Sequence, residues 1–344
     1  MRSNTATNWR SSLQKNNRRT YIIIGLFFAI YLSLGLLVDM YLDSHLYPQA
    51  SLQQLFLALL HFKIFPIATL VMFTVALISL LISYALYDKL MLLGTTYRKI
   101  TPETMETLAD KQLYNVVEEM KIAAGCRYMP AVFIIEADYM NAFASGYSEK
   151  SAMIAITRGL IEKLNRSELQ AVMAHELSHI RHLDIKLTLT ASLLANLMIM
   201  VLDIFFYHAM FSQRSSSNSG SRSRNSLASI IILLRYLLPL INILLLLYLS
   251  RTREFMADAG CVELMRDNQP LGSALLKIQQ DHVAHQEKYI QDYQNTPHEN
   301  VRQEAYIYSP LQAGLTSMNS LTDFFSTHPS LAARLAAIGF KQVP

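Results

Sequence analysis

Cysteine and charged residues are both scarce in this chain of 344 residues. The two cysteines, Cys126 and Cys261, are far apart in the sequence, which excludes a disulfide framework and a cysteine-based zinc site. So few cysteines also fit a reducing compartment. Only 16% of the residues are charged, whereas 52% are hydrophobic. Because the apolar residues gather in a few long blocks, the composition indicates an integral membrane protein.

The net charge of +4 does not indicate a nucleic-acid-binding protein. In a membrane protein, an excess of Arg and Lys reflects the residues that flank the membrane spans. We therefore expect the lipid bilayer as a partner and no nucleic acid.

Four apolar blocks are long enough to cross a bilayer, which takes about 20 residues in a helix. They cover residues 21–42, 64–86, 187–207 and 230–249. The last two blocks contain a charge further from their ends, so a buried helical hairpin inside a soluble domain is an alternative for them. The polar loop between them, residues 212–227, is rich in Ser, Asn and Arg and is expected to be disordered.

The N-terminal tail, residues 1–20, carries Arg and Lys but no acidic residue. The apolar run after it is too long for a signal peptide and lacks a cleavage site, so we expect an uncleaved anchor. The positive-inside rule then places the N-terminus in the cytoplasm, residues 43–63 outside and residues 93–186 in the cytoplasm. The arginines of the 212–227 loop contradict this rule if both later blocks span the membrane.

Between the second and third blocks, the sequence predicts an α+β unit. Apolar residues at helical spacing predict a helix within residues 103–125, which ends at Gly125. A second helix is expected to begin with a capping box between Ser167 and Gln170. Three short apolar runs predict strands: 131–136, 141–145 and 152–157.

The stretch AVMAHELSHIRH, from Ala171 to His182, lies in this second helix. Residues four apart share one face of a helix, so His175 and His179 can direct ring nitrogens at one metal ion. Glu176 would lie beside the metal, where it can take a proton from the water that zinc activates and pass it to the leaving amine. The alternative is a solvated helical face.

A catalytic zinc site needs a third protein ligand and an open position for water. The metzincin motif fails here, because His182 stands where Gly is required and Ile185 where the third His is required. The stretch SRTREFMADAGCVELM, after the fourth block, offers Glu254, with Asp258 one turn later on the same face. Glu254 would bind the metal, and Asp258 would fix the tautomer of a ligand histidine. The alternative for Glu254 is an exposed helical charge.

Four segments occur in a characteristic order: NAFASG at 141–146, AHELSH at 174–179, SRTREFMADAG at 250–260 and THPSLAARLAAI at 327–338. Together they resemble the HtpX family of membrane-integrated gluzincin metallopeptidases, which are related to the CAAX prenyl proteases. The resemblance runs from Thr20 to the C-terminus. It implies a cytoplasmic zincin-like domain and one zinc ion per chain. It also implies roles for four residues, with Glu176 as general base and the zinc held by His175, His179 and Glu254.

The resemblance also implies how substrate binds. NAFASG resembles an edge strand that pairs with an extended protein or peptide, with Asn141, Ala142 and Phe143 as contacts. His328 and Arg334 resemble residues near the active site, where either side chain can stabilise an oxyanion. A turn before the last helix is the alternative for His328. The segment 281–325 departs from the family pattern and is free to shape substrate access or to cover the site.

The expected fold is α+β and mainly α-helical, with four transmembrane helices and a cytoplasmic metalloprotease domain. The resemblance implies a multi-pass endopeptidase of the cytoplasmic (inner) membrane that cleaves misfolded or damaged proteins in quality control and the stress response. A prenyl-protein-type peptidase and a non-catalytic membrane holdase are the alternatives. The expected parts are a basic tail (1–20), two spans (21–92), a catalytic part (93–186), a hydrophobic hairpin (187–250) and a second catalytic part with the third ligand and C-terminal helices (251–344).

Overall fold

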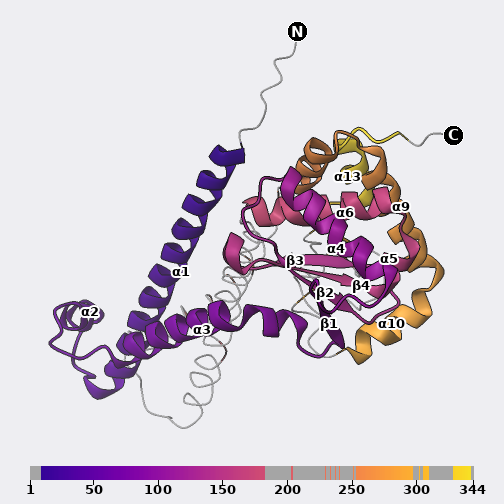
Figure 1. The fold of residues 1–344 in the computed structure, drawn as a ribbon. Coiled ribbons are helices and arrows are strands. Elements are labelled where there is room, and N and C mark those ends of the chain that lie inside the picture. Colours follow the sequence, from indigo (N-terminus) through magenta and orange to yellow (C-terminus); the bar gives the residue numbers. More distant parts are fainter. Residues whose placement is uncertain are drawn as a thin grey trace. The chain divides into compact units, whose positions relative to one another are not determined.

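The protein is described from a computed structural model (Figure 1). The structure describes residues 9–182, 203, 229, 233, 237, 240, 251, 253–296, 302, 305–309 and 328–341. The predicted third and fourth spans and the polar loop between them therefore lie outside the described residues, apart from residues 203, 233, 237 and 240. The chain divides into two units: Met1–Arg18, Leu86–Thr188 and Leu246–Pro344 in the first, and Arg19–Ala85 and Leu189–Leu245 in the second.

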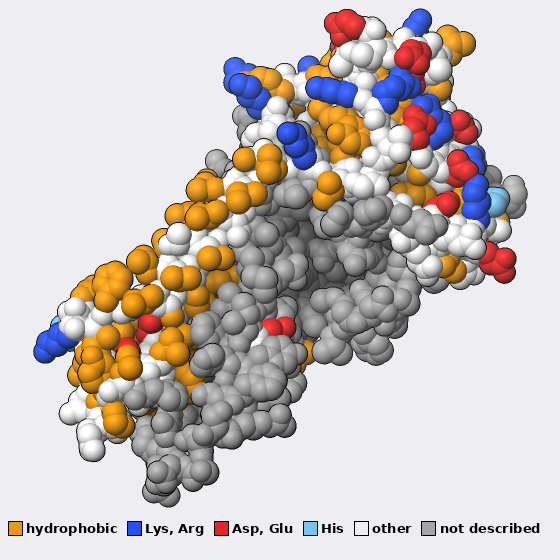
Figure 2. Space-filling view, turned by 90° about the horizontal axis from the view of Figure 1, so that it is seen from below, with side chains coloured by type: hydrophobic (Ala, Val, Ile, Leu, Met, Phe, Trp, Pro, Cys, Tyr) orange, Lys and Arg blue, Asp and Glu red, His pale blue; other side chains and the backbone are white. Residues whose placement is uncertain are grey.

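Three helices occupy the N-terminal part of the chain: α1 (Trp9–Leu46), α2 (Leu52–Leu60) and α3 (Ile67–Leu92). Among the residues that the structure describes, one helical segment, Ile67–Leu86, is long and apolar enough to cross a membrane. It coincides with the predicted second span. Its own apolar side chains, such as Leu70, Ile78 and Leu81, are exposed at its surface. Figure 2 shows that hydrophobic side chains gather over these helices. The predicted first span lies within α1.

The single acidic residue of the predicted first span, Asp39, has a structural role. Its buried carboxylate accepts hydrogen bonds from the backbone N–H groups of Ala68 (2.7 Å) and Thr69 (2.9 Å). These are among the first N–H groups of α3, which have no partner within their own helix. Gly35 lets the two helices approach, because a Cβ there would lie 2.5 Å from the Cα of Thr69. Asp39 therefore fixes the start of α3 against α1.

The first unit contains a four-stranded mixed sheet in the order β1-β2-β4-β3. Strands β2 and β4 are parallel, whereas β1 pairs with β2 and β3 pairs with β4 in antiparallel fashion. The three predicted strands are confirmed to within one residue at each end. The first strand was not predicted, because its sequence YRKI lacks an apolar run. The strands are β1 (Tyr97–Ile100), β2 (Ala131–Ile135), β3 (Ala142–Ser145) and β4 (Met153–Thr157).

Helices α4 and α6 pack side by side over this sheet, and α6 also contacts β3 and α9 (Figure 1). The helix predicted within residues 103–125 is confirmed as α4, and Gly125 follows it with a positive φ of 67°. A short 3-10 turn, Glu149–Ser151, precedes β4. The helices of this unit are α4 (Leu108–Ala123), α5 (Arg158–Lys163), α6 (Arg166–His182), α9 (Gln269–Ala284), α10 (Gln286–Asn295) and α13 (Leu331–Ala337).

The capping box of α6 lies two residues before the predicted one. The side chain of Asn165 accepts a hydrogen bond from the backbone N–H of Glu168 at 2.9 Å, and the Glu168 carboxylate accepts one from the Asn165 N–H at 2.9 Å. The predicted pair, Ser167 and Gln170, is wrong because α6 already begins at Arg166. Both residues of that pair are inside the helix, so neither can cap it.

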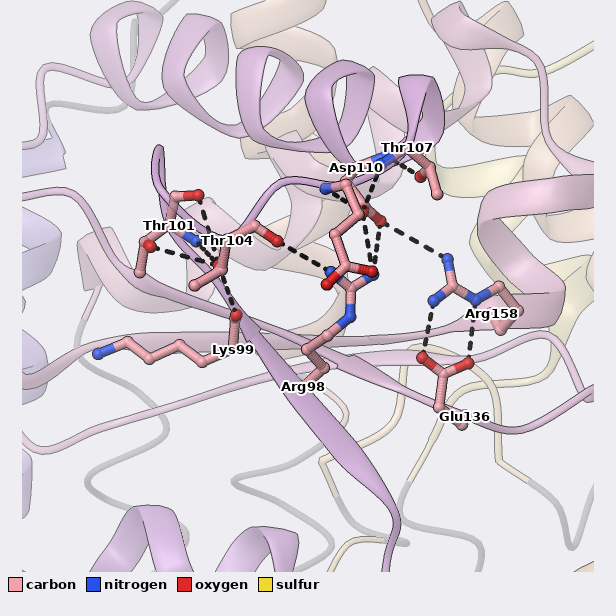
Figure 3. Close-up of polar contacts among 9 residues, drawn as sticks. Arg98, Lys99, Thr101, Thr104, Thr107, Asp110, Glu136 and Arg158 are labelled. Atoms are coloured by element: carbon pink, nitrogen blue, oxygen red, sulfur yellow. Dashed lines mark hydrogen bonds and ion pairs between the residues drawn. The ribbon is translucent and has the colours of Figure 1, made fainter.

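A buried carboxylate joins β1, α4 and α5 (Figure 3). Arg98 donates to both oxygens of Asp110 at 2.9 Å, and Arg158 approaches the same carboxylate at 3.7 Å. The backbone N–H groups of Thr107 and Glu106 also donate to it. Burial alone would raise the pKa of Asp110, but these N–H donors and the Arg98 guanidinium lower it to about 2. Asp110 is therefore ionised and fixes the first strand to two helices.

Candidate active site

Helix α6 carries the H-E-x-x-H residues inside the protein. His175 and Glu176 are fully buried, and His179 is 8% exposed. Apolar residues of the same helix, Val172 and Leu177 among them, are also fully buried. The alternative of a solvated helical face is therefore wrong. With neighbours on every side, the histidines point into the interior and not into water.

A second helical segment, residues 253–265, brings Glu254 and Asp258 to α6. Its close approach depends on Gly260, where a Cβ would lie 2.6 Å from the hydroxyl oxygen of Ser178. The thiol of Cys261 donates to the backbone carbonyl of Ala171 at 3.1 Å and links the same two helices. Glu254 is only 4% exposed, so the alternative of an exposed helical charge is wrong.

His175, His179 and Glu254 each present one ligand atom to a common point. The three atoms lie within 4.8 Å of one another. The Nε2 atoms of the two histidines are 3.1 Å apart, and the carboxylate oxygens of Glu254 lie 3.7 Å from His175 Nε2 and 3.6 Å from His179 Nε2. Two imidazoles and one carboxylate are a typical ligand set of catalytic zinc. The three residues therefore fit a zinc ion.

The protonation of these ligands also fits a cation. Burial lowers the pKa of His175, which favours the neutral imidazole that a metal ligand must be. Burial would raise the pKa of Glu254, but His328, His179 and Arg334 beside it hold that pKa well below its usual range. The site thus combines neutral imidazole with an ionised carboxylate.

Glu176 lies in the same buried region and has a different environment. Its carboxylate meets the backbone N–H of Ala144 on β3, which favours the ionised form and acts against the effect of burial. Burial raises its pKa to about 8. A carboxylate with such a pKa suits proton exchange near neutral pH, because it can accept a proton and release it again. A cation held by the three ligands would lower this pKa by its charge.

Asp258 and Arg334 form a buried ion pair behind His175. One Asp258 oxygen lies 3.0 Å from Nδ1 of His175, the ring nitrogen that faces away from the other ligands. Arg334, from α13, donates to both Asp258 oxygens at 2.9 and 2.7 Å. Burial would raise the pKa of Asp258, but Arg334 and His175 lower it to about 2. An ionised Asp258 can hold the His175 ring in one tautomer and orientation.

The structure also brings His328 and Arg334 to the ligand cluster, as the resemblance implied. Nδ1 of His328 lies 3.5 Å from a carboxylate oxygen of Glu254, and Nη1 of Arg334 lies 3.7 Å from the same oxygen. Both side chains are only 2–3% exposed. His328 lies at a bend of the chain just before α13, and this position before the last helix does not exclude a place at the site.

Ala142 and Phe143 lie on β3 at the edge of the sheet, and Asn141 directly precedes this strand. Helix α6 packs against the same strand. All three predicted substrate contacts are buried. Their neighbours Tyr306, Ile307 and Tyr308, which are not among the residues predicted from the sequence, pair with this edge. The run Tyr-Ile-Tyr has high strand propensity and was the available signal.

The chain matches the model of peptidase family M48 over residues 107–340. It is 35% identical over 332 residues to a protease HtpX homolog of Helicobacter pylori (strain Shi470), which covers 96% of this chain and 98% of that protein. A protease HtpX homolog of Dictyoglomus turgidum is 33% identical over 260 residues, covering 75% and 78% of the two chains. The crystal structure of S. mikatae Ste24p aligns at 19% identity with a TM-score of 0.46, covering 97% of this chain and 66% of that one.

Proposed function

The chain belongs to peptidase family M48, and we propose that it cleaves misfolded or damaged proteins at the cytoplasmic face of the inner membrane. As an M48 peptidase related to HtpX proteases over nearly its whole length, it is a metalloendopeptidase. The non-catalytic holdase is therefore set aside. What is proposed is the role of each site residue, the class of substrate and the cellular side.

The observation that supports the proposal best is the buried convergence of His175, His179 and Glu254, with Glu176 beside them. A zinc ion held by the first three residues would supply a Lewis acid that activates the attacking water. Glu176 would accept a proton from that water and later donate it to the leaving amine. No other buried acid is needed for these two transfers.

The neighbouring residues have supporting roles in this proposal. We propose that His328 donates a hydrogen bond to the oxyanion that forms on the substrate carbonyl, and its ring beside Glu254 supports this role. Arg334 directs its Nε and Nη2 atoms at Asp258, so we assign it mainly to positioning. Arg334 holds Asp258, and Asp258 in turn contacts Nδ1 of His175 and orients its ring.

Substrate binding is proposed at β3, through Asn141, Ala142 and Phe143. An edge strand recognises backbone N–H and C=O groups, so it binds extended peptide with little demand on sequence. Unfolded segments of many proteins can satisfy this requirement, whereas folded proteins rarely offer a free extended strand. This property suits a quality-control enzyme.

The membrane location is proposed from three observations. The α3 segment Ile67–Leu86 can cross a membrane, and relatives of nearly equal length are HtpX proteases. The basic N-terminal tail favours a cytoplasmic N-terminus. With α1 and α3 as consecutive spans, the catalytic unit would then lie on the cytoplasmic side.

The Glu176→Gln variant tests the catalytic assignment. In detergent micelles, the purified wild-type chain should cleave unfolded casein, and the variant should lose at least about 100-fold in rate because the proton acceptor is gone. Both proteins should hold one zinc ion per chain. Glu162→Gln, a change at an exposed residue, is the matched control and should cleave normally. A Glu176→Gln protein that cleaves casein at the wild-type rate would refute the assignment.

A further inference from the structure

Part of the edge of β3 is already paired with the chain itself. Phe143 forms an antiparallel bridge with Tyr306, and the N–H of Ile307 donates to the carbonyl of Ala142 at 2.9 Å. Residues 305–309, here called the strap, therefore continue the sheet beyond β3. The strap lies against the strand at which the proposed function places the substrate.

The side chain of Asn141 also binds the strap. Its amide nitrogen donates to the carbonyl of Tyr308 at 3.0 Å, and its amide oxygen accepts from the N–H of Tyr308 at 3.4 Å. The same oxygen accepts from the N–H of Ala142 at 3.1 Å. The Asn141 amide thus binds both backbone groups of Tyr308, as it could bind those of one residue in an extended peptide. The amide and carbonyl groups proposed to hold substrate are occupied by the strap.

The strap also reaches the catalytic centre. The carbonyl of Ile307 accepts a hydrogen bond of 2.6 Å from Nη1 of Arg334, the residue that holds Asp258 behind His175. One arginine therefore contacts both the strap and the residues that position a zinc ligand. A substrate carbonyl in the position of the Ile307 carbonyl would therefore be linked to Asp258 through a single side chain, that of Arg334.

Tyrosine contacts complete the binding of the strap. The ring of Tyr306 packs edge-on against Phe143, with ring centres 5.7 Å apart, and its hydroxyl lies 3.2 Å from that of Tyr139. Tyr306, Ile307 and Tyr308 are at most 3% exposed. The strap is therefore seated in a specific site and does not merely lie on the surface.

From these contacts we infer that the strap is an internal occupant of the substrate-strand site and must leave β3 before a protein substrate can pair there. The inference rests on the proposed function. Exchange of one antiparallel strand for another keeps the number of backbone hydrogen bonds nearly constant, so an unfolded segment can compete with the strap. A folded protein offers no free strand and leaves the strap in place. The strap thus excludes folded proteins.

A reversible cross-link tests whether the strap must leave. Phe143 and Tyr306 form a non-hydrogen-bonded pair, since the adjacent bond joins Ala142 and Ile307, and such pairs suit a disulfide. The variant Phe143→Cys/Tyr306→Cys should close the site on oxidation. The native thiols Cys126 and Cys261 are buried and do not interfere.

A matched control places the same cross-link elsewhere in the sheet. Tyr97 and Ile135 also form a non-hydrogen-bonded antiparallel pair, because the adjacent bond joins Glu136 and Thr96. The variant Tyr97→Cys/Ile135→Cys would link the opposite edge strand, β1, to its neighbour β2, away from the strap. Oxidation should leave its casein cleavage unchanged.

Oxidation of the Phe143→Cys/Tyr306→Cys chain should lower the rate of casein cleavage at least about tenfold relative to the same protein after reduction. The disulfide keeps the strap on β3, so the state that can pair with substrate is no longer populated. The zinc content should stay the same in both forms. An oxidised chain that cleaves casein as fast as its reduced form would overturn the inference.

A second variant weakens the strap instead of locking it. Ile307→Pro removes the N–H that donates to Ala142, so the strap should leave more readily. Its kcat/KM for casein should rise about threefold to tenfold, the effect of one lost hydrogen bond. An unchanged or lower kcat/KM would contradict the inference.

A labelling measurement separates this inference from the proposed function. In Glu176→Gln/Tyr306→Cys, excess casein should raise the rate at which a maleimide labels residue 306, which is buried while the strap is seated. An unchanged labelling rate would refute the inference. Absence of casein cleavage by the wild-type chain would contradict the proposed function, and the labelling rate would still decide whether the strap is displaced.

Discussion

At the scale of single residues, the position of His175 depends on two side chains that do not bind metal. Asp258 lies 3.0 Å from Nδ1 of His175, and Arg334 donates to both Asp258 oxygens. A partner on the second ring nitrogen fixes which nitrogen is free to bind a metal. The contacts therefore run from Arg334 through Asp258 to Nδ1 of His175, the ring whose other nitrogen, Nε2, faces His179 and Glu254.

Replacement of Asp258 by Asn should weaken zinc binding about 10- to 100-fold, because the neutral amide no longer holds the imidazole in its tautomer. Competition with a chelator of known zinc affinity measures the change. Glu263→Gln, which removes one negative charge from an exposed position of the same helical segment, should bind zinc as the wild type does. Equal zinc affinity in Asp258→Asn and wild type would show that the contact with His175 is incidental.

The spacing of His and Glu residues in the sequence predicts which side chains meet at the site. It does not predict the contacts that hold them in place. His175 and His179 are four residues apart on one helix, so their convergence follows from helical geometry. Glu254 required the pattern of a second segment together with the family resemblance. The contact of Arg334 with Asp258 bridges two segments 76 positions apart and has no local signal. Only the tertiary fold could place that guanidinium.

At the scale of elements, α6 and the sheet form because local signals and burial agree. The apolar runs predicted β2, β3 and β4 almost to the residue, whereas β1 carries the charged residues Arg98 and Lys99 and gave no such signal. Arg98 is needed there because its guanidinium binds Asp110. The strap was missed for a different reason: its Tyr-Ile-Tyr run favours a strand, but its pairing with β3 is long-range and has no local signal.

The ion pairs of Asp110 make stability depend on pH. The pKa of Asp110 is about 2 in the folded chain, below the ordinary value of about 3.9 that it regains on unfolding. Its contribution is therefore fully present above about pH 4 and is lost as the pH falls from there through about 2.

Asp110→Asn should therefore unfold at lower temperature than wild type at pH 7, and this difference should shrink as the pH approaches 3. Thermal unfolding of both detergent-solubilised proteins at the two pH values measures it. A constant difference between pH 7 and pH 3 would mean that the charge of Asp110 does not contribute.

At the scale of the whole molecule, the chain combines a metallopeptidase unit with one described helical segment, Ile67–Leu86, that is long and apolar enough to cross a membrane. The acidic residue in the predicted first span, Asp39, caps α3, which explains why a charge is tolerated in an apolar segment. The predicted spans 187–207 and 230–249 lie outside the described residues, so they stay predictions. Hydropathy alone could not choose between two spans and a buried hairpin there.

The proposed topology predicts which residues are reachable from each side of the membrane. In intact spheroplasts, a membrane-impermeant maleimide should label Gln49→Cys, in the connection between α1 and α2, but not Lys150→Cys, beside the sheet. Lys150→Cys should react only after lysis. Because both native cysteines are buried, background labelling should be low. Labelling of Lys150→Cys in intact spheroplasts would reverse the proposed orientation.

Reconstitution of the purified chain with zinc tests most directly whether His175, His179 and Glu254 hold the catalytic metal. Metal is removed with a chelator, and casein cleavage is measured as zinc is added back to wild type and to Glu254→Ala. The metal-free chain should be inactive, and wild type should recover fully at one zinc ion per chain. Glu254→Ala should not recover at that ratio. Casein cleavage by the metal-free chain, or full recovery of Glu254→Ala at one zinc ion per chain, would contradict the assignment of His175, His179 and Glu254 as the catalytic zinc site.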